Sequence, residues 1–149
     1  MAVLHLGVVN IPYAQRPTTR AKKTVSGTQT TGDVAEILEA KYGVMATFFD
    51  AHKTDIARSL EDKMSGELEN LLMGKRPNSN ALAAIGGDIQ KMFADFLDMR
   101  EIESMGVAGV PTQAALMGVN HRLKSGRGSP RPSFIDTGLY QASFRAWVD

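Results

Sequence analysis

The stretch PSFIDTGLYQASFRAWVD, residues 132–149, is richer in large apolar residues than the end of a chain usually is, because chain ends commonly consist of small polar residues. Pro132 favours an extended approach, since a proline restricts the residue before it to β-like angles. Asp136 or Thr137 is expected to cap a single helical turn, and Gly138 to let the backbone turn tightly there. The stretch therefore predicts a loop and a turn that lead into a final regular element.

That final element, ASFRAWV at residues 142–148, alternates its side chains with the period of a β-strand. One side of the strand carries Phe144, Ala146 and Val148, and the other carries Ser143, Arg145 and Trp147. Only one side can fill the core of the domain itself. Since tryptophan and arginine are favoured at interfaces, the side with Arg145 and Trp147 predicts an edge prepared for another chain. The alternative, that Trp147 covers the second face of the sheet in its own subunit, stays open.

Upstream, the spacing of apolar residues predicts long helices. Asp33 is expected to begin the first, with Glu36 completing a capping-box-like pair, and Gly43 to interrupt it. A second helix is predicted over residues 45–72, which Gly74 follows as a stop signal. Its apolar stripe recurs every three or four positions and comprises Met45, Phe48, Phe49, His52, Ile56, Leu60, Met64, Leu68, Leu71 and Leu72. We expect the methionines of this stripe to pack in the core.

A third helix is predicted over residues 80–104, and a fourth, shorter one over residues 112–124 with Thr112 as its cap. Gly86 and Gly87 are expected to weaken the third helix, since glycine costs about 1 kcal/mol relative to alanine inside a helix. The apolar face of the third helix comprises Leu82, Ile85, Ile89, Met92, Phe93, Phe96 and Leu97. The two long helices are expected to form an antiparallel pair.

The N-terminal segment, residues 2–11, is rich in β-branched residues and stops at Pro12, which predicts a strand. Residues 12–31 read as an extended arm, with a short strand expected around residues 24–28. The predicted fold class is α+β: long antiparallel helices packed on a small antiparallel sheet formed by the N- and C-terminal segments, with an extended N-terminal arm.

The length of 149 residues predicts a single domain over residues 1–149. Its expected parts are the arm at 12–31, a helical body at 33–124, and a basic loop, Asp-Thr-Gly turn and strand at 125–149. The sequence has no cysteine, which excludes a disulfide framework, a thiolate metal site and a cysteine nucleophile. No window approaches the roughly 18 apolar residues of a membrane-spanning helix, so we expect a soluble, intracellular product.

The net charge of +1 conceals an uneven distribution of charge along the chain. Residues 12–31 hold four basic residues and no acid, residues 119–135 again hold four and no acid, and residues 33–103 hold 14 acids against 8 bases. Two interpretations compete: basic arms that grip nucleic acid, or basic arms that reach an acidic surface on a neighbouring subunit. A third is that these loops are solvated and have no partner.

The three histidines, His5, His52 and His121, lack the paired spacing that places two metal ligands on one helical face. His52 has Asp55 at helical spacing, a pattern more typical of a packing residue. The sequence has no glycine-rich phosphate loop with a lysine. It therefore predicts no catalytic, metal or cofactor site, and a protein that is not an enzyme.

Residues 130–148, PRPSFIDTGLYQASFRAWV, resemble the basic-Pro, hydrophobic, Asp-Thr-Gly-x-Leu-x-x-Ser-aromatic signature of the virion-morphogenesis proteins of tailed bacteriophages. These are the neck and tail-completion proteins between portal and tail. The resemblance is carried by Arg131, Pro132, Ile135, Asp136, Thr137, Gly138, Leu139, Ser143 and Phe144. Residues 30–45 and 109–124 are also similar to segments of phage structural proteins. Members of the family often continue with further strands, so a neighbouring subunit is expected to complete the sheet.

The resemblance implies a structural virion protein that forms a homo-oligomeric ring of twelve- or six-fold symmetry at the head–tail junction, as a neck, collar, tail-completion or tail-terminator component. The implied partners are further copies of the chain, the portal or adaptor, and tail proteins. The implied location is the virion, and the host cytoplasm during assembly. The arm is expected to reach adjacent subunits, and the C-terminal edge strand to dock by strand addition.

The residues expected at subunit interfaces are Arg16, Arg20, Lys22, Lys23, Arg127, Arg131, Arg145 and Trp147. Some of the basic ones are expected to face genomic DNA in the lumen of the ring. The alternative function is a nucleic-acid-binding phage accessory protein that uses the same basic loops. Such a protein should show aromatic residues interleaved with the basic ones, and only Tyr13 and Phe134 lie near them.

Overall fold

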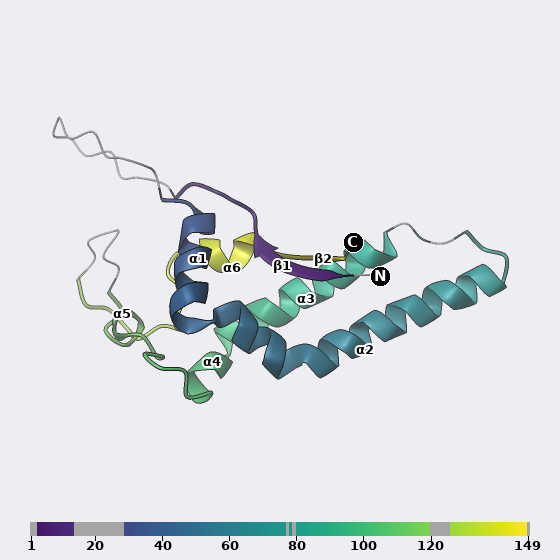
Figure 1. Cartoon of the computed structure of the whole chain (residues 1–149). Helices are drawn as coiled ribbons and strands as arrows, with labels where there is room; N and C mark the ends of the chain where they lie inside the picture. Colours follow the sequence, from purple (N-terminus) through teal and green to yellow (C-terminus); the bar gives the residue numbers. More distant parts are fainter. Residues whose placement is uncertain (1–2, 14–28, 77, 79, 120–125, 149) are drawn as a thin grey trace.

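The computed structural model of the chain describes residues 3–13, 29–76, 78, 80–119 and 126–148. Its elements in chain order are β1 (Leu4–Val8), α1 (Thr31–Tyr42), α2 (Val44–Leu72), α3 (Ala81–Asp98), α4 (Glu101–Ser104), α5 (Gln113–Leu116), α6 (Leu139–Ser143) and β2 (Phe144–Val148). The two strands come from the two ends of the chain, and α2 and α3 run antiparallel (Figure 1). The predicted α+β class and the small terminal sheet are confirmed.

The sheet packs with one face on α3. Its strands are antiparallel, with Leu4 opposite Val148 and Val8 opposite Phe144. On β2, Phe144 and Ala146 belong to the buried hydrophobic core, and on β1 the partly buried Leu4, Leu6 and Val8 pack against it. α3 lies between the sheet on one side and α2 on the other (Figure 1). The buried layer of the domain therefore follows α3.

Phenylalanine rings from α2, α3 and β2 meet at the centre of the core. Phe48, Phe93, Phe96 and Phe144 are almost wholly buried. Phe48 meets Phe93 edge to face with ring centroids 5.2 Å apart, and it meets Phe144 at 6.0 Å. Such aromatic pairs add about 0.5–1.5 kcal/mol each beyond the burial of their area. This cluster ties the C-terminal strand to both long helices.

Gly86 on α3 permits a close approach between helix and strand. A Cβ at Gly86 would lie 2.4 Å from the carbonyl oxygen of Ala146 on β2, well inside van der Waals contact. Its neighbour Gly87 is exposed and has open space around it. Beyond the helix weakening expected of both glycines, Gly86 therefore lets α3 touch the main chain of the sheet.

α1 begins at Thr31 with Thr30 as its cap, so the expectation that Asp33 begins the helix is wrong. The Thr30 hydroxyl accepts from the Asp33 N–H at 3.3 Å, and the Asp33 carboxylate accepts from the Thr30 N–H at 2.9 Å. The capping box thus pairs Thr30 with Asp33, not Asp33 with Glu36. The reason is tertiary: an isolated bridge to Pro12 keeps Thr30 extended, and an N-cap needs extended backbone.

The buried Thr31 ties α1 to the end of the N-terminal segment. Its hydroxyl donates to the Val9 carbonyl at 2.6 Å and accepts from the Ile11 N–H at 2.8 Å. Residue 31 therefore belongs to the helix and not to the arm expected over 12–31. The rest of that arm, with the strand expected around residues 24–28, lies for the most part outside the described residues.

Gly43 separates α1 from α2, as its position in the sequence predicts. Its left-handed φ of 58° ends α1 and turns the chain into α2. The Glu39 carboxylate then accepts from the N–H groups of Met45 and Ala46 at 2.7 and 3.1 Å. A side chain of one helix thereby satisfies first-turn donors of the next, which fixes the bend between them.

The predicted core stripe of α2 is buried only in the N-terminal part of the helix. Phe48 and Ile56 are 0% and 2% exposed, whereas Met64 and Leu68 are 62% and 57% exposed. Successive helical residues are about 100° apart, so each four-residue step advances the stripe by about 40° around the axis. The residues from Phe48 to Leu72 follow such steps, and the stripe winds away from α3. The expectation that Met64 packs in the core is wrong for this reason.

The single helix predicted over residues 80–104 is two helices. Arg100, with a left-handed φ of 58°, lies between the end of α3 and the start of α4. The turn brings Ile102 into the core, where it is almost wholly buried. The chain thus buries Ile102 by breaking the continuous helix that the apolar spacing predicts.

The fourth predicted helix is shorter than expected. Thr112 caps it by accepting from the Ala115 N–H at 3.2 Å, as predicted. α5 nevertheless ends at Leu116, because the returning chain crosses at Gly118: a Cβ there would lie 2.6 Å from the carbonyl carbon of Gly128. Residues 117–119 are not helical, and the last part of the expected helix, residues 120–124, lies outside the described residues.

Candidate interaction surfaces

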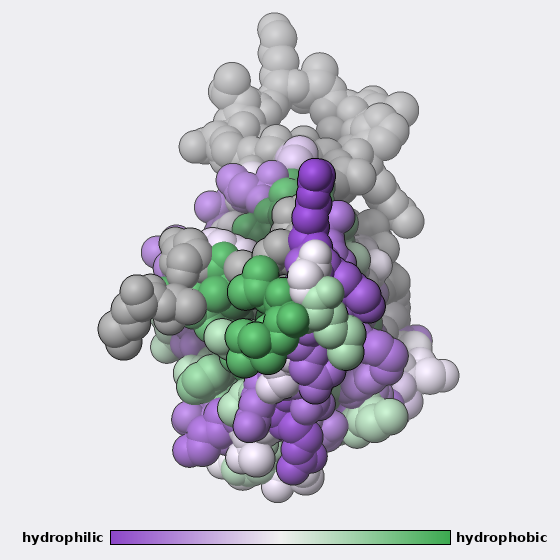
Figure 2. Space-filling model, turned by 90° about the vertical axis from the view of Figure 1, so that its right-hand side faces the viewer, coloured by the Kyte–Doolittle hydropathy of each residue, from purple (hydrophilic) through white to green (hydrophobic). Residues whose placement is uncertain are grey.

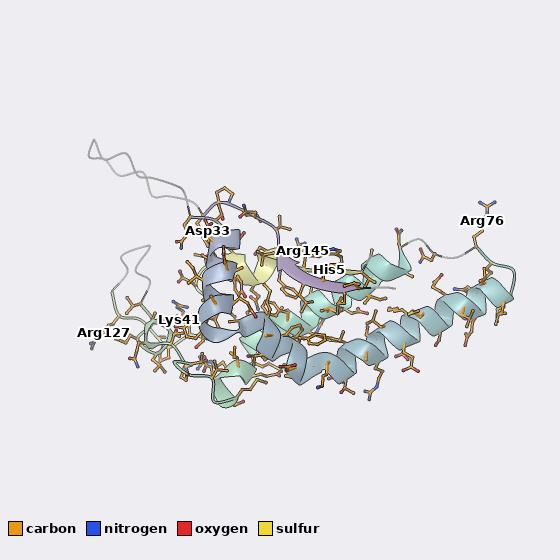
Figure 3. All side chains as sticks on the ribbon, viewed as in Figure 1. His5, Asp33, Lys41, Arg76, Arg127 and Arg145 are labelled. Atoms are coloured by element: carbon orange, nitrogen blue, oxygen red, sulfur yellow. The ribbon has the colours of Figure 1, made fainter. Side chains whose placement is uncertain are left out.

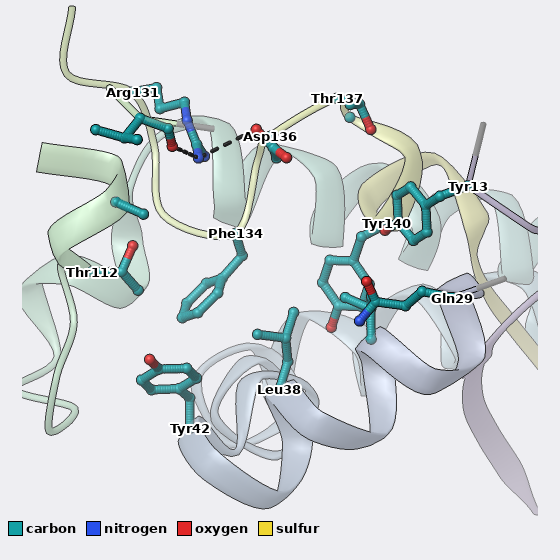
Figure 4. A pocket seen from close by; sticks show the side chains of 14 residues that line it. Tyr13, Gln29, Leu38, Tyr42, Thr112, Arg131, Phe134, Asp136, Thr137 and Tyr140 are labelled. Atoms are coloured by element: carbon teal, nitrogen blue, oxygen red, sulfur yellow. Dashed lines mark hydrogen bonds and ion pairs between the residues drawn. The ribbon is translucent and has the colours of Figure 1, made fainter. Parts of the chain in front are cut away.

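Arg131 holds together the loop that carries the phage resemblance. Its guanidinium donates to the carbonyls of Ile135 and Val119, the latter at 3.2 Å. It also forms an ion pair with Asp136, with Nη2 and Oδ1 3.3 Å apart (Figure 4). Both charged side chains are about three-quarters buried. Arg131 thus already has partners within its own subunit, and its expected role at a subunit interface stays a prediction.

Ser133 attaches the same loop to the helices beneath it. It is almost wholly buried, and both its N–H and its hydroxyl donate to a carboxylate oxygen of Glu103 at 2.8 Å. Its hydroxyl oxygen also accepts from the Thr112 N–H at 3.2 Å. The loop is therefore fixed to α4 and to the N-cap residue of α5.

Gly138 forms the turn that leads into α6. It has a left-handed φ of 75° and is the N-cap of the helix, so the cap expected at Asp136 or Thr137 is misplaced. Thr137 contributes from one position earlier, since its hydroxyl accepts from the Leu139 N–H at 3.4 Å. The left-handed turn needs a residue without Cβ, and this places the side chains of the preceding residues outside the helix.

The end of the resembling segment lies in the core. The buried Ser143 hydroxyl donates to the Tyr140 carbonyl at 2.8 Å and closes α6. Phe144, the next residue, enters the aromatic cluster. The signature residues of the segment thus form the loop and turn that position β2 in the sheet.

A cavity of about 580 Å³ lies between this loop and α1 (Figure 4). Its walls are mostly apolar, and its lining includes Tyr13, Val34, Leu38, Tyr42, Phe134 and Tyr140. The Tyr140 hydroxyl is buried and has no hydrogen-bond partner among the described residues. Burial, followed by the nearby Glu39 carboxylate, raises the pKa of Tyr140 far above its usual value. The cavity therefore holds a neutral phenol at all moderate pH values.

The outer sheet face, which we define as the side of the sheet turned away from α3, is formed by alternate residues of the two strands and includes Val3, His5, Val9 and Trp147. The His5 and Trp147 rings stack with centroids 5.2 Å apart and planes 12° from parallel. Gly7 lies beneath the indole, since a Cβ there would be 3.3 Å from it. Trp147 nevertheless remains 48% exposed, with Val3 and Val9 about equally exposed. This face is apolar and largely open.

Arg145 supplies a positive charge at the edge of the outer sheet face, where its side chain also borders Gln90 and Lys91 of α3 (Figure 3). It is exposed, and its guanidinium donates to the carbonyls of Ala142 and Phe144 at 2.9 and 2.6 Å. No ion pair joins it to an acid within the described part of the chain. These main-chain hydrogen bonds fix the position of the guanidinium, and its charge remains accessible to a partner.

The distal α2 stripe, defined as Met64, Leu68, Leu71 and Leu72, is a second exposed apolar surface. Leu71 and Leu72 are 54% and 79% exposed, and Met64 and Leu68 are also more than half exposed. Figure 2 looks onto the end of the molecule at which α2 ends and shows hydrophobic side chains gathered over the end of that helix. The apolar pattern of the sequence predicts these residues in the core, although their repeated four-residue spacing signals a stripe that winds around the helix.

Among the basic residues expected at interfaces, those in the described part of the chain do not form one cluster. Arg16, Arg20, Lys22 and Lys23 lie outside the described residues. Arg127 is exposed in the segment after α5, far from Arg145 (Figure 3). The described cations are therefore spread over different faces of the subunit.

His52 has structural contacts. Its Nε2 lies 2.9 Å from a Glu101 carboxylate oxygen, and its ring contacts those of Phe48 and Phe96. Within the described residues, no group of three or more histidines and acids could hold a metal ion. No helix in that part of the chain is long and apolar enough to cross a membrane.

Comparisons of the chain with protein-family models, with curated proteins and with solved structures gave no match.

Proposed function

We propose that this chain is a structural virion protein of a tailed bacteriophage, and that it forms a homo-oligomeric ring at the head–tail junction between portal and tail. The sequence signature of residues 131–144 is the starting point of the proposal. It places no catalytic, metal or cofactor role on any residue.

One observation carries the proposal: the signature residues fold as a unit that leads into a strand with one exposed face. Arg131, Asp136 and Gly138 form the turn, Phe144 anchors it, and Trp147 is then presented on the outer sheet face. A two-stranded sheet is rarely stable unless other elements cover it, and the described helices cover only one of its faces. A neighbouring subunit that covers the other face would complete the sheet.

The charge distribution supports contacts between unlike surfaces. An acidic helical region, residues 33–103, is flanked by the basic segments 12–31 and 119–135. Unlike surfaces on one subunit favour head-to-tail association, which closes into a ring when the rotation per subunit permits. In such a ring the arm at 12–31 contacts adjacent subunits or the connector, and some basic side chains face genomic DNA.

The test combines two mass measurements. The copy number of the chain in purified virions is measured by quantitative mass spectrometry, and the oligomeric state of the purified protein by native mass spectrometry. The proposal expects a small copy number per particle that matches one ring of six or twelve subunits.

Absence from virions, together with a monomer that retains DNA, would overturn the proposal and favour a nucleic-acid-binding accessory protein. That alternative expects DNA affinity to fall steeply with salt concentration, because each phosphate contact releases counterions.

A further inference from the structure

The distal α2 stripe and the outer sheet face are both apolar and exposed. Met64 and Leu68 are more than half exposed, and Trp147 is about half exposed. Exposed apolar surface gains about 25 cal/mol per Å² when it is buried, so contiguous patches of this kind mark interaction sites. Within the described part of the chain, these exposures show that neither surface is covered by another element.

The two surfaces are also complementary in charge. Residues 61–72 of α2 carry four acids and one base, a net charge of −3: Glu61, Asp62, Glu67 and Glu69 against Lys63. Glu61 precedes Met64 by three positions and Leu68 by seven, so it lies on the same side of the helix as the stripe. The edge of the outer sheet face carries the exposed Arg145, which forms no ion pair among the described residues.

We propose that the distal α2 stripe of one copy docks on the outer sheet face of a second copy, with Glu61 facing Arg145 across the contact. The inference rests on the proposed ring and names the surfaces that join its subunits. Since α3 lies between α2 and the sheet, the two surfaces belong to different sides of one subunit (Figure 1). The contact is therefore head-to-tail, the type that closes into rings.

Charge reversal tests the pairing in the full-length purified protein by sedimentation velocity over a concentration series. Arg145→Glu or Glu61→Arg alone is expected to weaken association about ten-fold or more, since each places like charges opposite each other. The double variant is expected to recover most of the natural affinity. Unchanged association in both single variants, or no recovery in the double variant, would overturn the pairing.

The apolar part is tested with a matched control. Leu68→Ser combined with Leu72→Ser is expected to reduce association strongly. Met99→Ser, at an equally exposed methionine after α3, is expected to leave association unchanged. Far-ultraviolet circular dichroism checks that every variant remains folded. Folded variants that associate as the natural chain does would contradict a role for the stripe.

Disulfide cross-linking tests proximity, because the natural chain has no cysteine. A Ser65→Cys chain mixed with a Val3→Cys chain is expected to form a mixed disulfide dimer on oxidation. The same Ser65→Cys chain mixed with an Ala108→Cys chain, exposed in the loop after α4, should not.

The outcomes separate this inference from the proposed function. A ring in virions whose subunits neither cross-link nor respond to charge reversal would leave the proposed function standing and overturn the surface assignment. A chain that is absent from virions and monomeric at all concentrations would overturn both.

Discussion

The ring of Phe144 stacks on that of Phe93, with centroids 4.0 Å apart and planes 18° from parallel. Phe93 lies in the middle of α3, and Phe144 is the first residue of β2. This stack and the close contact at Gly86 are the means by which the last strand is held on the helix. Stability of the C-terminal segment and presentation of Trp147 therefore depend on Phe144.

Replacing Phe144 by alanine should destabilise the fold by about 3–5 kcal/mol, because it empties a wholly buried aromatic site. Urea unfolding followed by circular dichroism measures the change. Trp147→Ala is the control: it should keep the helical signal and most of the stability while it impairs assembly. A loss of helical signal in Trp147→Ala would instead place Trp147 in the monomer core.

Adjacent glycines on α3 should respond in opposite directions to alanine. Gly86→Ala should destabilise by about 1–3 kcal/mol, because its Cβ would overlap the Ala146 carbonyl oxygen. Gly87→Ala should stabilise by up to about 1 kcal/mol, since alanine favours the helix and the site is open. Thermal unfolding of the two variants checks the sign of each effect, and equal shifts would refute the close contact.

The capping box of α1 should make stability depend on acid pH. Hydrogen bonds from the Thr30 N–H and hydroxyl hold the pKa of the Asp33 carboxyl below its usual value of 3.8. A lowered folded-state pKa adds stability above pH 3.8 that is lost as the pH falls through the folded value. Asp33→Asn should therefore remove part of the decline in stability below pH 4, measured by denaturant titration at several pH values. An unchanged pH profile in this variant would contradict the capping box.

Arg131 and Arg127, which lie four positions apart in the same loop, should differ in their effect on stability. Arg131→Met should cost about 2 kcal/mol, because the Val119 and Ile135 carbonyls and the Asp136 carboxylate lose their charged donor. Arg127→Met should change stability by less than about 0.5 kcal/mol, since Arg127 is exposed. Chemical unfolding curves of the pair provide the comparison. Equal stability of the two variants would show that the hydrogen bonds and the ion pair of Arg131 do not stabilise the loop.

Tyr140 should titrate abnormally. Burial raises its pKa above the ordinary value of 10.0, so the stability of the fold is unaffected by this group below pH 10 and falls as the pH rises further, because the unfolded state ionises first. Ultraviolet absorbance titration should show a phenol that ionises only on unfolding. Tyr140→Phe should abolish that late transition and raise stability by about 1 kcal/mol, because it removes a buried hydroxyl without a described partner. A hydroxyl that titrates near pH 10 in the folded protein would contradict its burial.

Local chemistry was sufficient for several elements. The alternation of Phe144, Ala146 and Val148 predicts the strand and its inward face, since side chains of a strand alternate whatever its partners are. Gly43 and Thr112 mark helix boundaries because a left-handed turn and an N-cap each depend on one residue and its immediate neighbours.

Tertiary structure decided where those elements stop and which faces they bury. Thr30 rather than Asp33 caps α1 because a distant residue, Pro12, pairs with it. α2 leaves its stripe exposed beyond Leu60 because the four-residue repeat winds around the helix while α3 stays on one side. The sequence by itself thus determined the helices, the terminal strand and the α+β class. Only the packing of α2, α3 and the sheet decided which apolar side chains fill the core and which remain on the surface, since that choice depends on contacts between residues far apart in the chain.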